Sequence, residues 1–209
     1  LMISFQRLLG REDEFFGLLE ASATECVASI SALRVVLSRP GEKPALEAFA
    51  AARRKDKEVT QRLEEMLIHV FVTPIEREDI EELADKLYKI PKVIEKFAER
   101  YALVFDRVAD VRFDGQAEAL ERAVSMLQRM VAALHKADIA AIKSKQSELR
   151  GLARGAEIAL AESLSTLYQP GYDALKAIIV HDLFALLERA MERTREAAAV
   201  IAHILLKNS

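Results

Sequence analysis

The chain has 209 residues, enough for one large domain or two small ones, since a domain averages roughly 150 residues. Hydrophobic residues make up 51% and charged residues 30%, which excludes a disordered chain, and the seven glycines and five prolines are too few for a many-stranded β-sandwich. The net charge of −3 argues against a nucleic-acid partner, and the single cysteine, Cys26, excludes an internal disulfide framework. The longest apolar run has ten residues, whereas a membrane-spanning helix needs about 20, so we expect a soluble, cytosolic protein.

Six long amphipathic helices are predicted, because apolar residues recur at spacings of three and four along almost the whole chain. We expect them at about residues 12–38, 44–71, 74–109, 116–135, 138–168 and 173–207. Most of these helices would be rods of roughly 30 to 50 Å at 1.5 Å per residue. Rods of this length joined by short connections pack as an antiparallel bundle, so the expected fold class is all-α.

Turn and capping residues set the expected helix ends. The segment 39–44 contains two prolines and a glycine, and Pro44 is placed to be the first residue of the second helix. Thr73-Pro74-Ile75-Glu76 has the pattern of a capping box at the start of the third helix. We expect a kink at Pro91, where the apolar period continues past the proline. Phe113-Asp114-Gly115 should be the central break, and shorter breaks are expected at 136–138 and 169–171.

Three helices on each side of a central break suggest an internal duplication. A shift of 100 residues pairs apolar positions such as Val27 with Leu127, Ile30 with Met130, Leu67 with Leu167, Ile80 with Val180, Leu83 with Leu183 and Leu87 with Leu187. Any two amphipathic helices in phase match in this way, so the agreement of helix number and break positions is the stronger observation. We expect a single domain over 1–209, made of two three-helix-bundle repeats at about 11–110 and 114–207 that pack side by side.

Residues 71–80 read Phe-Val-Thr-Pro-Ile-Glu-Arg-Glu-Asp-Ile. This segment closely resembles the F-[IV]-T-P-[IF]-[DE]-R-E-D-I signature of the PhoU-like family, in the branch of Pit accessory proteins or phosphate transport regulators. The six-helix layout and the ending 202–207 are compatible with that family over nearly the whole chain. The resemblance implies a PhoU-like six-helix fold and a non-enzymatic regulator or adaptor. It also implies a Pit-type phosphate permease as partner and a cytoplasmic location, peripheral at the inner membrane through that transporter.

PhoU-like proteins carry acidic [ED]-x-x-x-D motifs on helices of each repeat, and some bind iron or zinc clusters there. Residues four apart share one helix face, so facing helices can gather carboxylates around a cation. In the first repeat the matching positions are Arg53, Lys57, Tyr88, Lys89 and Lys92. Cations at these positions repel a metal, so we expect no metal site in this repeat. The four basic residues Arg53, Lys57, Lys89 and Lys92 are either a solvated helix face or a patch for an anion such as phosphate or for an acidic partner loop.

The second repeat keeps more of the acidic pattern. Glu188 and Glu192 match the motif of the sixth helix, and Glu157 matches one position on the fifth helix, where its expected partner is Ala153. One interpretation is a residual site for a single divalent metal held by Glu157, Glu188 and Glu192, with magnesium, calcium or manganese favoured by an all-carboxylate ligand set. The alternative is a solvated face on which these carboxylates pair with neighbouring arginines.

Three classes of function remain open from the sequence: a regulator, a metal-binding protein and a purely structural, dimerising bundle. The favoured class is a non-catalytic regulator that docks to a transporter or to a second copy of itself as a homodimer. The alternative is a carboxylate-ligated metal-binding bundle or metalloenzyme. The chain contains no glycine-rich phosphate loop and no Glu-x-x-His pair, and its four histidines are scattered, which weighs against an enzyme. Cys26 lies on an apolar stripe and is expected to be a buried, inert thiol.

Overall fold

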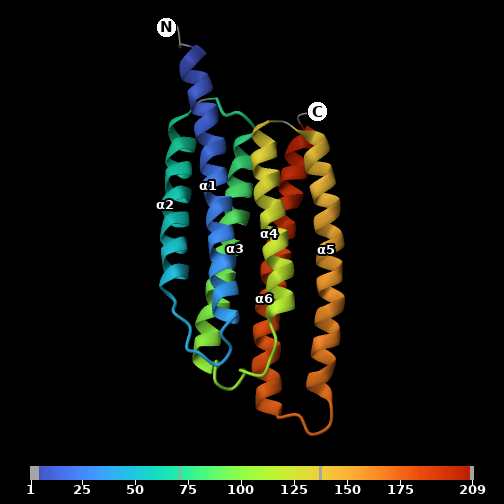
Figure 1. The fold of residues 1–209 in the computed structure, drawn as a ribbon. Coiled ribbons are helices and arrows are strands. Elements are labelled where there is room, and N and C mark those ends of the chain that lie inside the picture. Colours follow the sequence, from blue (N-terminus) through green and yellow to red (C-terminus); the bar gives the residue numbers. More distant parts are fainter. Residues whose placement is uncertain (1–4, 71, 137, 208–209) are drawn as a thin grey trace.

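The computed structural model describes residues 5–70, 72–136 and 138–207, with side chains described from Asp13 onward. Within these ranges the chain forms six α-helices and a single 3₁₀ turn, with no strand (Figure 1). The elements are α1 (Phe5–Leu37), α2 (Glu47–His69), α3 (Arg77–Val104), α4 (Asp114–His135), α5 (Ile139–Ser165), η1 (Thr166–Tyr168) and α6 (Ala174–Lys207). The predicted all-α fold is therefore confirmed. The expected end of the second helix at Phe71 and the turn residue Ala137 lie outside the described residues.

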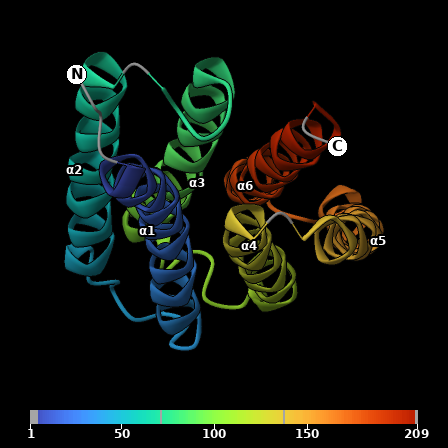
Figure 2. The ribbon, with the colours of Figure 1, turned by 90° about the horizontal axis from the view of Figure 1, so that it is seen from above.

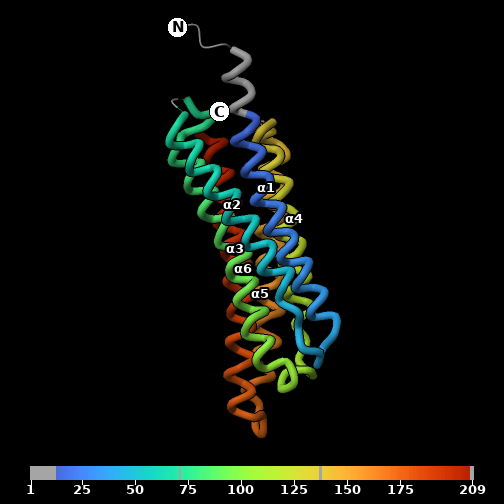
Figure 3. Tube along the Cα trace, turned by 90° about the vertical axis from the view of Figure 1, so that its left-hand side faces the viewer, coloured from blue at the N-terminus to red at the C-terminus, as the bar shows by residue number. Residues whose placement is uncertain are grey.

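The six helices form two three-helix bundles that lie side by side (Figures 1 and 2). Helices α1, α2 and α3 pack on one another, as do α4, α5 and α6. The bundles meet where α1 packs against α4 and α3 packs against α6, which leaves α2 and α5 at the outer edges. Figure 3 shows the resulting elongated body edge-on, with all six helices running along its length.

Two helices begin later than the capping signals predicted. Helix α2 begins at Glu47 instead of Pro44, because Leu46 packs against the core from the cap position while the preceding residues carry the chain across from α1. Helix α3 begins at Arg77 instead of Pro74, and the capping box is not formed. The carboxylate of Glu76 instead accepts a hydrogen bond from Lys207 Nζ at 2.7 Å, which ties the start of α3 to the end of α6.

The other helix ends lie close to the predicted positions, with a few differences. Helix α3 continues through the buried Pro91 but ends at Val104, five residues before the predicted end, and turns follow it. The central break at Phe113-Asp114-Gly115 is the start of α4, where Phe113 is the cap residue. The side chain of Asp138 caps α5 by accepting a hydrogen bond from the backbone N–H of Ala141 at 3.0 Å.

Four aromatic side chains join the two bundles near the start of α4. Phe113 packs edge-on against Phe97 and Tyr101 of α3, with ring centroids 5.6 and 6.2 Å away, and contacts Phe184 of α6 at 4.8 Å. All four rings are at most 3% exposed. Because one cluster contains side chains from both halves of the chain, the bundles share a continuous core.

Among the described residues, one helix, α1, is long and apolar enough to be considered as a membrane span. By length and composition, its segment Asp13–Leu37 could cross a membrane, with a mean hydropathy of 1.2. However, 56% of that window is buried inside the protein, and Phe15, Leu19 and Ile30 are at most 1% exposed. The apolar stripe of α1 is therefore accounted for by packing in the core of the first bundle.

Candidate functional site

The first bundle contains a charged cluster centred on Arg53 of α2. Its guanidinium group lies between two carboxylates, with Nη1 3.3 Å from Asp56 Oδ2 and Nε 3.3 Å from Glu95 Oε2 of α3. The guanidinium carbon also lies 4.3 Å from the centre of the Tyr88 ring, in a cation–π arrangement. The Arg53 side chain is only 15% exposed, so its charge is largely withdrawn from solvent and satisfied inside the protein.

Asp56 is the most buried charged group of this cluster. Its carboxylate has no exposed surface and accepts a hydrogen bond from Ser22 Oγ of α1 at 2.8 Å. Burial raises the pKa of Asp56 above its ordinary value, although the Ser22 hydrogen bond and the Arg53 charge act to lower it. Burial likewise raises the pKa of Glu95, again against the lowering effect of Arg53. The guanidinium of Arg53 therefore holds together two carboxylates that the fold has partly desolvated.

The four basic residues predicted to form an anion or partner patch do not have equivalent environments. Arg53 points inward to Asp56 and Glu95, as described above. Lys89 pairs with Asp85 one turn earlier on α3, with Nζ 2.5 Å from Oδ2. Lys57 and Lys92 are exposed, on α2 and α3 respectively. An anion site at this patch stays a prediction, and Lys57 and Lys92 are its most accessible members.

Sequence reasoning missed Ser22, Asp56 and Glu95 as members of the charged cluster. A signal was present, because Asp56 continues the spacing of the buried Phe49 and Ala52 toward Leu63 on the inner face of α2. A carboxylate at such a position requires a buried partner. The basic residues around it in the sequence drew attention to the exposed face instead.

In the second bundle, the three predicted carboxylates line one pocket between α5 and α6. Glu157, Glu188 and Glu192 lie around a cavity of about 300 Å³, together with Arg189 and Arg195. Arg195 Nη1 donates a hydrogen bond to Glu157 Oε1 at 2.9 Å, so an arginine already pairs with one of the proposed ligands. Among the residues that the structure describes, no group of three acidic, histidine or cysteine side chains is placed to hold a metal ion. The three carboxylates thus share a pocket in which one of them is paired with an arginine, and a metal site there stays a prediction.

Each bundle carries an arginine–carboxylate pair between its outer helix and its third helix, with the charges reversed. In the first bundle Arg53 of α2 pairs with Glu95 of α3, and in the second Glu157 of α5 pairs with Arg195 of α6. The 100-residue shift of the predicted duplication places Glu95 on Arg195, whereas Glu157 falls on Lys57, one turn from Arg53. Each outer helix is therefore linked to the third helix of its bundle by one arginine–carboxylate contact.

The remaining candidate side chains form no catalytic grouping in the described part of the chain. The Cys26 thiol is fully buried and contacts the carbonyl oxygen of Leu87 at 3.4 Å. Burial raises the pKa of Cys26 well above its ordinary value, so the group is held as an unreactive thiol, as predicted. His69, His181 and His203 are exposed, and His135 stacks on Phe16 at a ring distance of 4.7 Å.

This arrangement of two three-helix bundles is the PhoU-like fold. A PhoU-like protein of Shewanella oneidensis MR-1 superposes with a TM-score of 0.73 at 12% identity, covering 92% of this chain and 99% of that chain. A second protein of the same organism, provisionally described as a PhoU-like phosphate regulatory protein, superposes with a TM-score of 0.70 at 11% identity and the same coverage.

The sequence is also similar to a curated protein. It is 22% identical over 214 residues to a protein of Rhizobium meliloti (strain 1021) that carries the provisional name of pit accessory protein, and the match covers 98% of both chains. No family model matches this chain. The resemblance to PhoU-like Pit accessory proteins predicted from residues 71–80 is thereby confirmed over nearly the whole length.

Proposed function

We propose that this protein is a non-catalytic regulator of phosphate transport that acts at the cytoplasmic side of a Pit-type phosphate permease. The observation that carries the proposal is the end-to-end similarity to a protein named as a pit accessory protein. The PhoU-like fold, shared with a protein described as a phosphate regulator, supports the same conclusion.

The chemistry of the two charged clusters favours regulation by binding over catalysis. The arginines at the centre of the two clusters, Arg53 and Arg195, are paired with carboxylates of the same bundle, and among the described residues no nucleophile lies beside either pair. The long helices α2 and α5 lie at the outer edges, where their exposed faces are accessible to another protein. The alternative of a metal-binding bundle has less support, because one of its three proposed ligands, Glu157, is paired with Arg195.

Reconstitution tests the proposal. Purified protein is added to the cytoplasmic side of vesicles that contain the Pit-type permease of the same organism, and the initial rate of radiolabelled phosphate uptake is measured. We expect a dose-dependent, saturable change in that rate, and no change in vesicles that carry an unrelated transporter. A rate that is the same at every protein concentration would contradict the proposed function.

A further inference from the structure

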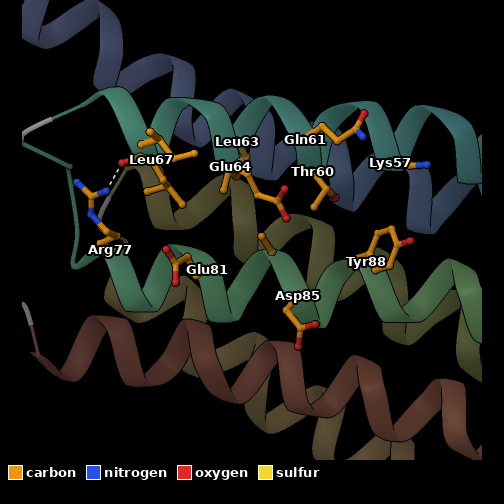
Figure 4. Close-up of a pocket in the computed structure, with 12 residues that line it drawn as sticks. Lys57, Thr60, Gln61, Leu63, Glu64, Leu67, Arg77, Glu81, Asp85 and Tyr88 are labelled. Atoms are coloured by element: carbon orange, nitrogen blue, oxygen red, sulfur yellow. Dashed lines mark hydrogen bonds between the residues drawn. The ribbon is translucent and has the colours of Figure 1, made fainter.

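A groove runs between α2 and α3 on the outer side of the first bundle (Figure 4). Its volume is about 770 Å³, and its base is apolar, formed by Leu63 and Leu67 of α2 and by Ala84 of α3. Ala84 lies between the bulkier Ile80 and Leu87 on α3. Its small side chain leaves open a space that larger side chains fill on the neighbouring turns of the helix. Ile68, on the rim, is 75% exposed.

The groove has two defined ends. At one end Arg77 reaches from α3 to the last turn of α2, where it donates hydrogen bonds to the carbonyl oxygens of Leu67 and Val70. At the other end lie Tyr88, whose ring is covered by Arg53, and the exposed Lys57. The α3 segment from Arg77 to Tyr88 corresponds to about 16 Å of helix, or about three turns. A short helical segment of a partner fits this length better than a small molecule does.

The rim of the groove is acidic. Glu64 of α2 and Glu81 of α3 line it, and neither forms an ion pair with any residue that the structure describes. Asp85, further along the same rim, is paired with Lys89. The charged residues that line the groove are three carboxylates, Glu64, Glu81 and Asp85, against two cations, Lys57 and Arg77, which gives a net charge of −1. The carboxylates lie along the middle of the groove and the two cations at its ends, and Arg77 is already engaged with backbone carbonyl oxygens, so the field along the middle is negative. This charge disfavours nucleic acid or an anionic membrane surface and favours a cationic ligand.

We propose that this groove is the docking site for a basic amphipathic helix of a partner protein. The apolar face of that helix would pack on the exposed Ile68 and above the buried base of Leu63, Leu67 and Ala84, and its lysines or arginines would pair with Glu64 and Glu81. The identification of the partner as a membrane transporter rests on the proposed function. A basic partner helix agrees with the excess of lysine and arginine that membrane proteins carry in their cytoplasmic segments.

The binding test uses a fluorescently labelled amphipathic peptide of about 15 leucine and lysine residues, whose binding is followed by anisotropy. We expect saturable binding to the wild-type protein and about tenfold weaker binding to the Glu64→Gln/Glu81→Gln variant, because two rim contacts are lost. The matched control is Glu65→Gln/Glu82→Gln, which changes the net charge equally on the adjacent, exposed residues outside the groove. Equal weakening in both variants, or no binding to the wild-type protein, would overturn the proposal.

A second variant tests the apolar base. Ala84→Leu fills the groove without a change of charge and should abolish peptide binding while circular dichroism shows an intact helical fold. Unchanged binding by the folded variant would refute the groove as the binding site. Light scattering of the wild-type protein and the variant tests whether a second copy occupies the groove. A dimer that dissociates on Ala84→Leu would assign the groove to self-association and overturn the proposal.

The transport assay separates the groove from the proposed function. If the wild-type protein and Glu64→Gln/Glu81→Gln change phosphate uptake equally, the groove is not the docking site, although the function stands. If neither changes uptake while the peptide still binds in a groove-dependent manner, the proposed function fails and the binding site stands. If only the wild-type protein changes uptake, both proposals are supported.

Discussion

Replacement of Arg53 by methionine should destabilise the first bundle through the loss of a buried cation. The guanidinium lies 3.3 Å from a carboxylate oxygen of both Asp56 and Glu95. At an effective dielectric constant of about 20, each attraction is worth about 5 kcal/mol before the cost of desolvation. Removal of one partner from a buried ion pair costs about 3–5 kcal/mol, because the remaining charge is left uncompensated. Since Glu95 is 26% exposed and partly solvated, we expect the lower end, about 3 kcal/mol.

The pH dependence of this loss identifies its cause. Burial already raises the pKa values of Asp56 and Glu95, and removal of Arg53 takes away a charge that lowers both. A carboxylate whose pKa is higher in the folded state than its unfolded value of about 4 contributes fully to the free energy of unfolding only below that unfolded pKa. This contribution is lost as the pH rises through the folded-state pKa. The difference in unfolding free energy between Arg53→Met and the wild-type protein should therefore be largest near neutral pH and shrink as pH falls toward about 4.

Urea unfolding at several pH values measures this difference. The matched control is Arg54→Met, which removes the same charge from the exposed neighbouring position and should change stability by no more than about 0.5 kcal/mol. Addition of Asp56→Asn to Arg53→Met should recover part of the loss, because the amide requires no buried counter-ion. A loss that is the same at every pH, or equal losses for Arg53→Met and Arg54→Met, would refute the electrostatic explanation.

Three further predictions concern the core and the two candidate sites. Phe113→Ala should lower the free energy of unfolding by about 3–5 kcal/mol, because its ring packs against residues of both bundles. The variant should still unfold in a single calorimetric transition, and two separate transitions would contradict a shared core. Protein purified without added metal should contain less than one equivalent of metal by elemental analysis, because Arg195 pairs with Glu157; stoichiometric manganese or zinc would reverse this interpretation. If Lys57 and Lys92 bind phosphate, millimolar phosphate should raise the melting temperature more than chloride at equal ionic strength, and Lys57→Gln/Lys92→Gln should remove that difference; equal effects of the two salts would eliminate the anion site.

The helical fold could be predicted from the sequence because its signals are local and periodic. The apolar spacing along α1 identified its buried stripe, and the lengths of the helices implied a bundle. The helix starts were less accurate. Helix α3 begins at Arg77, so Glu76 is its cap residue and not the third residue of a helix that starts at Pro74, and the capping box does not form. The Glu76 carboxylate pairs with Lys207 of α6, a contact that local sequence does not reveal.

The candidate sites were only partly predictable because they depend on pairings between helices. Glu157, Glu188 and Glu192 were selected because they match the acidic motif of the PhoU-like family, and the structure places all three around one pocket. The sequence could not show that Arg195 pairs with Glu157, or that Arg53 turns away from its basic neighbours toward buried carboxylates. Which carboxylate an arginine side chain pairs with depends on the rotation of its helix and on how deeply the side chain is buried. Neither quantity follows from residue spacing alone.

The most direct test of the proposed regulatory function is a comparison of phosphate uptake in four strains of the host organism. The strains carry or lack this gene, each in the presence or absence of the Pit-type permease, and the initial rate of labelled phosphate uptake is measured at fixed external phosphate. We predict that loss of the gene changes uptake when the permease is present and has no effect when it is absent. An unchanged rate in the permease-containing strain, or the same change in both backgrounds, would contradict regulation through that transporter.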